Sequence, residues 1–245
     1  MLKVHDISKS FSSHPVLSRF SIELNAGQSL GLLGPSGCGK TTALRIIAGL
    51  ERADQGRVQL ADQIWTEGTH HLVPPEKRGI GFVFQNYALW PHLSVREHLE
   101  FPLRMQNKKD PSRVQEILEL LQIEKLQSRM PAQLSGGQQQ RVALGRALIA
   151  APQLVLFDEP LSNLDASLRS QVRSEIRKLQ EKFGFASLLV SHDWDDVSVL
   201  CDQVVVMHEG RILQKGSPQE LKSQPANDFV AAMVQTGDSK TRLKG

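Results

Sequence analysis

Residues 34–41 read GPSGCGKT, and this stretch decides the fold of the chain. The apolar run Ser29–Leu33 before it predicts a short strand, and Thr42–Leu50 after it has the apolar spacing of a helix. The loop between them matches the pattern GxxxxGK(S/T), whose backbone N–H groups curl around phosphate oxygens at a helix N-terminus. We therefore expect Lys40 to reach the β and γ phosphates of a nucleotide and Thr41 to ligate magnesium. The alternative is a glycine turn that only caps a helix.

A second unit of strand and helix lies further along the chain. Leu154–Phe157 predicts a buried strand, and Leu168–Phe183 predicts an amphipathic helix. The strand leads into Asp158 and Glu159, at the edge where open α/β sheets bind ligands. Because neighbouring side chains on a strand point to opposite sides, we expect Asp158 to face the magnesium ion and Glu159 to face the attacking water. The alternative is an acidic exit from a strand.

The remaining periodic segments complete an α/β protein with a mostly parallel core sheet. Ser187–Val190 predicts another strand, and Val204–Met207 and Arg211–Gln214 predict a hairpin. Between Asn86 and Gln133, strand patterns disappear. Helical patterns replace them at Ser94–Phe101 and Ser112–Leu121, which predicts an inserted helical subdomain.

The composition excludes several classes of protein. The 245 residues are 40% apolar and 22% charged, as in an ordinary globular protein, and the net charge of +3 comes without a long basic block, so nucleic acid is not an expected partner. The apolar runs are far shorter than the roughly 20 residues that span a bilayer. The N-terminus has no secretory pattern, which predicts a cytoplasmic chain. Its two cysteines have no zinc-ligand spacing, and residues 236–245 form a polar tail.

Residues 134–138 read LSGGQ, and with the phosphate loop they connect the chain to a family. Taken alone, Ser135 and Gln138 form a capping box that opens a helix, and such a glycine-rich helix start is itself an anion site. The chain resembles the ATP-binding subunits of ABC transporters from about Leu2 to Gln235. The resemblance implies an ATP-binding domain over residues 1–235, with a RecA-like P-loop NTPase core, an antiparallel β subdomain and a helical subdomain at about 87–150.

The resemblance also implies ATP and Mg²⁺ as ligands and assigns roles to individual residues. Glu159, His192, Gln85 and Lys40 are expected to act in catalysis, and Thr41, Gln85 and Asp158 to hold the metal. Phe11 resembles the aromatic residue that stacks on adenine, although a packed core side chain is the alternative. A lone histidine such as His192 is also a common surface or core residue. The expected nucleotide contacts are Phe11, Gly34, Pro35, Ser36, Gly37, Cys38, Gly39, Lys40, Thr41 and Thr42 of one copy, and Ser135, Gly136, Gly137 and Gln138 of the other.

The partners that the resemblance implies are a second copy of the chain and separate membrane permeases. The two copies would join head to tail around ATP, with the loop Ser162–Asp165 crossing their interface. The permeases would dock near Gln85, where apolar residues are available, and the system would include an extracytoplasmic solute-binding protein. The chain would sit peripherally at the cytoplasmic face of the plasma membrane. The apolar candidates for docking are Tyr87, Leu89, Trp90, Leu93 and Phe101.

Segments such as 87–95 and 160–169 resemble the solute importers, which include systems for maltose-like sugars, polyamines, iron and small oxyanions. We expect the chain to lack the C-terminal regulatory domain of that subgroup. The main alternative is a non-transport cassette ATPase, but the spacing between Gln85 and Leu134 is too short for a long coiled-coil insertion. A soluble phosphoryl transferase would leave Ser135–Gln138 unexplained, and a nucleotide-binding module without turnover would leave Glu159 unexplained.

Overall fold

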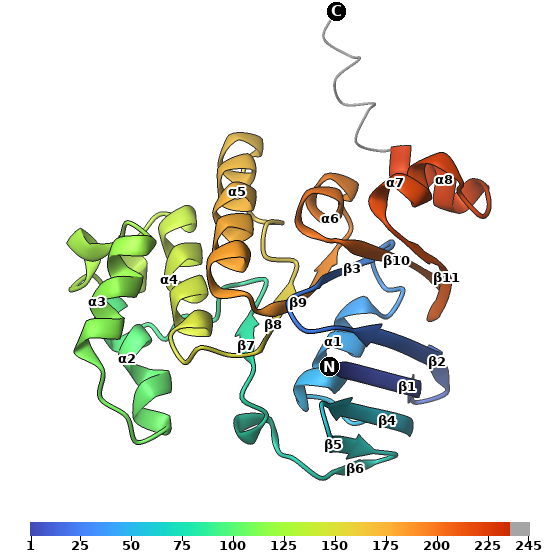
Figure 1. Ribbon diagram of the computed structural model, residues 1–245, viewed down its shortest axis with the longest axis horizontal. Helices are drawn as coiled ribbons and strands as arrows, with labels where there is room; N and C mark the ends of the chain where they lie inside the picture. Colours follow the sequence, from blue (N-terminus) through green and yellow to red (C-terminus); the bar gives the residue numbers. More distant parts are fainter. Residues whose placement is uncertain (236–245) are drawn as a thin grey trace, which may run out of the picture.

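The computed structural model describes residues 1–235, and the polar tail predicted at 236–245 lies outside the described residues. Two sheets and one group of helices follow one another along the molecule (Figure 1). A six-stranded sheet with the order β11-β10-β3-β9-β8-β7 lies in the middle, and its pairs are parallel except for the β10–β11 hairpin. A five-stranded antiparallel sheet with the order β2-β1-β4-β5-β6 flanks it. The predicted mostly parallel core and antiparallel subdomain are confirmed.

The strands of the antiparallel sheet are β1 (Leu2–Phe11), β2 (His14–Leu24), β4 (Gln55–Leu60), β5 (Gln63–Glu67) and β6 (His70–His71). Those of the core sheet are β3 (Ser29–Leu33), β7 (Gly81–Val83), β8 (Leu154–Asp158), β9 (Ala186–Ser191), β10 (Gln203–His208) and β11 (Arg211–Gly216). The α-helices are α1 (Lys40–Ala48), α2 (Val95–Met105), α3 (Pro111–Leu120), α4 (Gly136–Leu148), α5 (Ala166–Phe183), α6 (Trp194–Leu200), α7 (Pro218–Ser223) and α8 (Asp228–Gln235). Short 3₁₀ turns occupy η1 (Pro75–Lys77), η2 (Glu124–Leu126) and η3 (Pro131–Gln133).

The central strands are apolar without interruption because both faces of the core sheet are covered. In β8, Leu154 and Leu156 pack into the cluster around α1, whereas Val155 and Phe157 pack into the cluster around α4, α5 and α6. All five residues of β8 are buried, as expected for a parallel strand between two layers of helices. The carboxyl ends of these strands therefore meet at one edge of the sheet, next to the N-terminus of α1.

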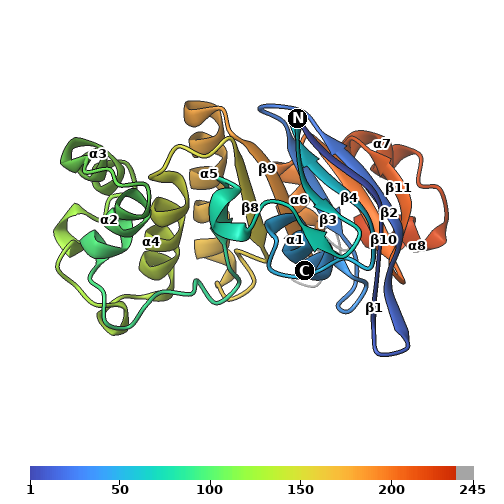
Figure 2. The same ribbon diagram turned by 90° about the horizontal axis from the view of Figure 1, so that it is seen from below.

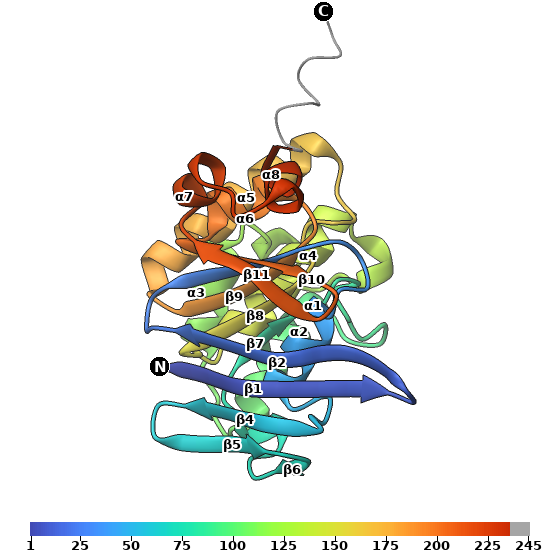
Figure 3. The same cartoon turned by 90° about the vertical axis from the view of Figure 1, so that its right-hand side faces the viewer.

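Helix α1 lies between the core sheet and the antiparallel sheet (Figures 2 and 3). Its apolar residues share one buried cluster with strands from both sheets. Buried Arg78 joins the layers, because its guanidinium donates to the carbonyl oxygens of Ile46 and Ile47 at the end of α1 and to Thr66 Oγ1 on β5. Burial lowers the pKa of Arg78 to about 10. The end of the helix that follows the phosphate loop is thereby fixed to the flanking sheet.

The predicted helical insertion is formed by α2, α3 and α4 with the 3₁₀ turns between them. Helix α2 begins after Ser94, which makes a capping box with Glu97, and it runs past the predicted end at Phe101 to Met105. Pro102 lies inside this helix and did not end it. Helix α1 also differs from its prediction, since it begins at Lys40 rather than Thr42 and ends at Ala48 rather than Leu50. Its C-terminal boundary is Gly49 at φ 79°, a left-handed cap.

Every helix within residues 1–235 is too short or too polar to cross a bilayer. Both cysteines, Cys38 and Cys201, are free and buried.

Candidate functional site

The N-terminus of α1 is the one start among helices α1–α7 of the described chain that has no side-chain cap. Each of the helices α2–α7 begins with a serine or aspartate whose side chain accepts a backbone N–H of the first turn. Before α1 stands Gly39, which has no side chain to accept one. The first N–H groups of this helix are thus left for another acceptor, and with the helix dipole they favour an anion.

The loop 34–39 wraps this helix start tightly, and two of its glycines are required by close contacts. A Cβ atom on Gly34 would lie 2.4 Å from the carbonyl oxygen of Met207, and one on Gly39, at φ 101°, would lie 2.5 Å from that of Val16. Gly37, at φ 82°, faces open space with no atom within 4 Å of its Cβ position. The loop therefore forms a cradle that is closed at its base and open at its lip, as a phosphate site requires.

Lys40 lies inside this cradle. Its side chain is almost fully buried, and Nζ donates to the carbonyl oxygens of Gly34 at 2.7 Å and Pro35 at 2.9 Å. Cys38 is 5% exposed, with its sulfur 3.8 Å from the same ammonium group, and burial raises the pKa of its thiol. The positive charge is thus held at the floor of the loop without a carboxylate partner among the ion pairs of the described residues.

Thr41 and Asp158 face each other at the edge of the core sheet. The Thr41 hydroxyl donates to Asp158 Oδ1 at 2.8 Å, and burial raises the pKa of the Asp158 carboxyl. A hydroxyl and a carboxylate oxygen are hard ligands of the kind that Mg²⁺ prefers. Burial disfavours the Asp158 carboxylate, and a cation between these oxygens would relieve that cost. The donor set at this point therefore fits a magnesium ion that is also bound by phosphate.

The direction of the Glu159 side chain has a reason other than the predicted one. The strand ends at Asp158, and Glu159 has φ 45°, with its N–H donating to the carbonyl oxygen of Val190 at 3.0 Å. Strand alternation was the wrong argument, since a left-handed turn sets the direction of this side chain. Glu159 Oε2 lies 3.4 Å from Gln85 Nε2 and 3.3 Å from His192 Nδ1.

Gln85 and His192 both lie next to the Glu159 carboxylate, and they come from different segments of the chain. Gln85 follows β7, and its Nε2 is also 3.3 Å from Ser162 Oγ, while its carbonyl oxygen accepts from Asn163 Nδ2 at 2.9 Å. His192 follows β9, and half of its side chain is exposed. The structure therefore places Gln85 and His192 next to the Glu159 carboxylate, whereas Thr41 contacts the neighbouring residue Asp158.

The LSGGQ segment opens α4, at a distance from the phosphate loop. Ser135 and Gln138 make the predicted capping box, with Ser135 N–H donating to Gln138 Oε1 at 3.0 Å. Gln140 Nε2 donates to the carbonyl oxygen of Pro160, which ties the start of α4 to the turn after Glu159. Helices α4 and α1 lie on different sides of β8 in both views (Figures 1 and 2). Ser135 and Gly136 are exposed.

Phe11 lies at the end of β1 and is 46% exposed, with Lys9 Nζ 4.9 Å from its ring centroid. The alternative of a packed core side chain is therefore excluded, and the ring is available to stack on a ligand. Trp194 is buried in α6. Thr42 lies in the first turn of α1 and is half-buried.

Four charged residues around His192 were missed by the sequence analysis. Arg169 and Arg173 project from α5, and Asp193 and Asp196 follow His192. Arg169 Nη1 lies 2.8 Å from Asp193 Oδ2, and Arg173 Nη1 lies 3.7 Å from Asp196 Oδ1. The signal in the sequence is a pair of arginines four residues apart on a predicted helix and three aspartates within the four residues after the histidine. Contact between the two segments comes from the fold alone.

Of the five apolar residues predicted for permease docking, three line surface hollows and two are packed in the interior. Trp90 and Phe101, with ring centroids 4.6 Å apart, line a groove of about 330 Å³ between β7, α2 and α4. Leu93 lines the adjoining hollow. Tyr87 is buried and Leu89 packs against the main core, so these two belong to the subdomain interior.

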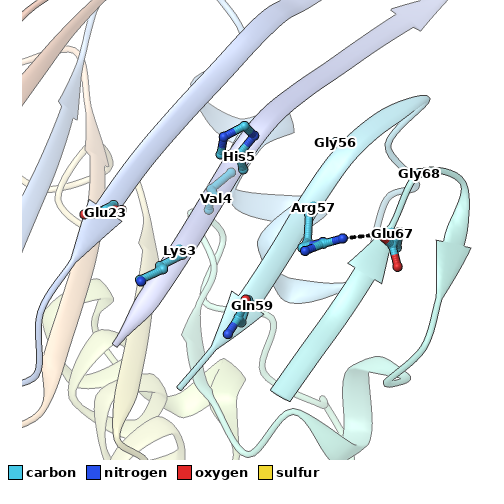
Figure 4. Close-up of a pocket in the computed structure, with 9 residues that line it drawn as sticks. All are labelled: Lys3, Val4, His5, Glu23, Gly56, Arg57, Gln59, Glu67 and Gly68. Atoms are coloured by element: carbon cyan, nitrogen blue, oxygen red, sulfur yellow. Dashed lines mark hydrogen bonds and ion pairs between the residues drawn. The ribbon is translucent and has the colours of Figure 1, made fainter. Parts of the chain in front are cut away.

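The outer face of the antiparallel sheet carries a separate hollow of about 530 Å³ (Figure 4). Charges of both signs line it: Lys3 and Arg57 lie between Glu23 and Glu67, and Arg57 pairs with Glu67 at 2.5 Å. It contains none of the predicted nucleotide contacts.

Comparisons with known proteins agree with this geometry. The sequence model of the ABC transporter family matches residues 17–162. The chain is 44% identical over 237 residues to the trehalose/maltose import ATP-binding protein MalK of Thermococcus litoralis, covering 95% of this chain and 64% of that protein. It is 46% identical over 239 residues to the spermidine/putrescine import ATP-binding protein PotA of Shigella dysenteriae serotype 1, covering 96% and 61%. The chain thus spans less than two thirds of the length of these relatives.

Solved structures give the same assignment. A dimeric ATP-binding cassette in a post-hydrolysis state, bound to ADP and Pi, matches with a TM-score of 0.78 and 30% identity, over 89% of this chain and 98% of that one. A nucleotide-free ATP-binding cassette from an ABC transporter matches with a TM-score of 0.81 and 28% identity, over 95% and 98%. The family match agrees with the glycine loop at the uncapped start of α1, with the LSGGQ start of α4 and with the fold. The chain belongs to the ABC transporter family.

Proposed function

We propose that the chain binds MgATP and hydrolyses it to drive the import of a solute through separate membrane permeases. The observation that carries the proposal is the uncapped start of α1, which opens beside the carboxylates of Asp158 and Glu159. The N–H groups and Lys40 would bind the phosphates, and Thr41 and Asp158 would hold Mg²⁺, with Gln85 as a further ligand. The metal would neutralise charge on the phosphate oxygens. Phe11 would stack on the adenine ring.

In the proposed reaction, Glu159 takes a proton from a water molecule whose oxygen attacks the γ-phosphorus. The bond from the γ-phosphorus to the bridging oxygen breaks, and ADP and phosphate leave. Gln85 and His192, which flank the Glu159 carboxylate, would orient the water and contact the γ-phosphate. Hydrolysis thus needs the carboxylate as a base and the lysine as a phosphate ligand, which makes Glu159 and Lys40 the two residues with the largest expected effects.

We propose that a second copy of the chain completes the site on the side of the γ-phosphate. Ser135, Gly136 and Gln138 are at least partly exposed, and their helix α4 lies on a different side of β8 from α1 of the same chain. A head-to-tail dimer would place this helix start, with its favourable dipole, against the γ-phosphate held by the partner. A relative of the same fold is described as a dimer. ATP would then join the two copies, and its hydrolysis would let them separate.

The permease contact is proposed at the Trp90–Phe101 groove. The groove is apolar and lies on the subdomain that also carries the LSGGQ helix, so a partner seated there would sense its movement. MalK and PotA are named as import proteins for trehalose/maltose and spermidine/putrescine, which supports import and a position at the cytoplasmic face of the membrane. An extracytoplasmic binding protein would deliver the solute.

Two measurements test the proposal. The full chain should release phosphate from MgATP, and Glu159→Gln should still bind the nucleotide while its turnover falls about 100-fold or more. A chain that binds no MgATP, or a Glu159→Gln variant that hydrolyses it at the wild-type rate, would refute the ATPase assignment.

The partner is tested by charge substitution in the groove. Trp90→Glu or Leu93→Glu should stop transport and spare basal hydrolysis. Leu72→Glu is the matched control, because Leu72 is an apolar residue 56% exposed and outside the groove. Unchanged transport in the groove variants would rule out this docking site.

A further inference from the structure

We propose that the first turn of α5 links the LSGGQ helix of a chain to the His192 of the same chain, with Arg169 and Asp193 as positioning residues. In the proposed dimer, these two elements belong to different ATP sites. The inference rests on the proposed function, and it names the route by which one site would regulate the other.

The His192 segment is held on both sides by side chains. His192 is the single residue between the end of β9 at Ser191 and the helix cap Asp193. On one side, the Ser191 hydroxyl donates to Asp196 Oδ2 at 3.1 Å. On the other, Asp193 uses Oδ1 to accept Asp195 N–H at 2.9 Å and Oδ2 to accept Arg169 Nη1 at 2.8 Å. The backbone of His192 therefore follows the position of Arg169.

Arg169 belongs to the first turn of α5, directly after the loop 162–165. Its N–H donates to the carbonyl oxygen of Asp165, the cap of this helix. The Arg169–Asp193 pair is about four-fifths buried on both sides, so solvent screens it less than an exposed pair. One turn later, Arg173 Nη1 lies 3.7 Å from Asp196 Oδ1. Helix α5 thus holds the His192 segment at two points.

The residue before Arg169 contacts the other element. A Cβ atom on Gly137 would lie 2.9 Å from Leu168 Cδ2 and 3.0 Å from Leu168 Cδ1, so the helix start of α4 packs on this leucine without space between them. The first turn of α5 therefore contacts the LSGGQ helix through Leu168 and the His192 segment through Arg169. A shift of the α4 start against a partner's nucleotide would move this turn, and with it the support of His192.

The positioning role is tested with the purified full chain and MgATP. Arg169→Gln should lower kcat at least about tenfold, because a displaced catalytic group costs rate without loss of binding. The KM for ATP should stay within about twofold. Asp193→Asn keeps a helix cap and should act similarly. The double variant should lose about tenfold rather than about 100-fold, since both changes remove one contact.

Two variants separate positioning from general structure. Arg169→Lys should restore part of kcat. Arg177→Gln, on the same helix but 41% exposed and paired with Glu181, should leave kcat unchanged. The free energy of unfolding, measured in urea for each variant, shows that the chain is folded.

The link to α4 has its own cycle. The kcat of the double variant Leu168→Ala/Asp193→Asn should differ by about threefold or more from the value expected if the two single effects multiplied. When the same comparison is made in the Arg169→Gln background, the two effects should multiply. Multiplicative effects would overturn the link, and full activity of Arg169→Gln would overturn the positioning role. A wild-type chain without ATPase activity would instead refute the proposed function and this inference with it.

Discussion

Replacement of Gly136 by alanine should damage hydrolysis and leave the isolated chain intact. A Cβ atom at Gly136 has no atom within 4 Å, whereas one at Gly137 would collide with Leu168. Gly136 lies in the first turn of α4, where alanine raises helix stability by at most about 1 kcal/mol. Within one chain, the substitution is therefore harmless or slightly stabilising.

The Gly136→Ala substitution should weaken only the contact between the start of α4 and the nucleotide bound to the partner copy. A methyl group on this exposed helix start would hold a phosphate oxygen away from the backbone N–H groups. A hydrogen bond to a charged group contributes about 1.5–3 kcal/mol. Its loss predicts about 10- to 150-fold weaker engagement of the second copy, and a fall in ATPase activity of the same order.

The assay pairs phosphate release with urea unfolding of the same variant. We expect an unfolding free energy equal to or above that of the wild type, together with the loss of activity. Full ATPase activity in Gly136→Ala would refute the reasoning, because it would mean that nothing approaches this helix start during hydrolysis. Loss of both activity and stability would also count against it.

Three further predictions follow from buried groups. In a Cys201→Ser chain, a thiol reagent should modify Cys38 and inactivate the protein at neutral pH, but more slowly than it modifies free cysteine, because burial raises the pKa of the Cys38 thiol. MgATP should protect Cys38 from the reagent. Equal modification with and without nucleotide would contradict the placement of Cys38. Asp196→Asn should raise the free energy of unfolding at pH 8 by up to about 3 kcal/mol. Burial, with Asp193 nearby, raises the pKa of Asp196 to about 6, so the wild type gains stability as the pH falls below 6. The difference in stability between the two proteins should therefore vanish near pH 4. An Asp196→Asn chain that is less stable than the wild type at pH 8 would contradict the prediction. Arg78→Met should lower the free energy of unfolding by about 3–5 kcal/mol in urea, because the carbonyl groups at the end of α1 lose a charged donor, with Arg78→Lys intermediate; an unchanged midpoint would show that water replaces the guanidinium.

The elements of the core sheet could be predicted because their patterns are local. Strands such as Leu154–Asp158 are buried on both faces and therefore read as uninterrupted apolar runs. The predicted hairpin is β10–β11, and it turns at Glu209 and Gly210, both with positive φ. A capping box in the sequence also marked the start of α4.

The strands of the antiparallel sheet were expected only from the family resemblance, and their boundaries were not predicted. Register shifts interrupt the β1–β2 pairing after Val4 and after Ile7, so the alternation of apolar and polar residues is broken. Asp6 and Arg19 have positive φ at these irregular positions. A period of two cannot be recognised across such bulges.

The direction of the proposed catalytic side chains could not be predicted from local patterns either. Glu159 is aimed by its N–H bond to Val190 on a neighbouring strand, and its contacts with Gln85 and His192 join three separate segments. The charged pairs behind His192 likewise link α5 to α6. These contacts depend on how distant segments meet, which a single sequence does not encode in any one stretch.

The sedimentation behaviour of the Glu159→Gln chain tests the central claim most directly. With the base removed, bound MgATP should persist, and the protein should sediment as a dimer with MgATP and as a monomer without it. A second change, Ser135→Arg, should abolish the dimer while nucleotide stays bound. A Glu159→Gln chain that is saturated with MgATP and still sediments as a monomer would contradict a site completed by two copies.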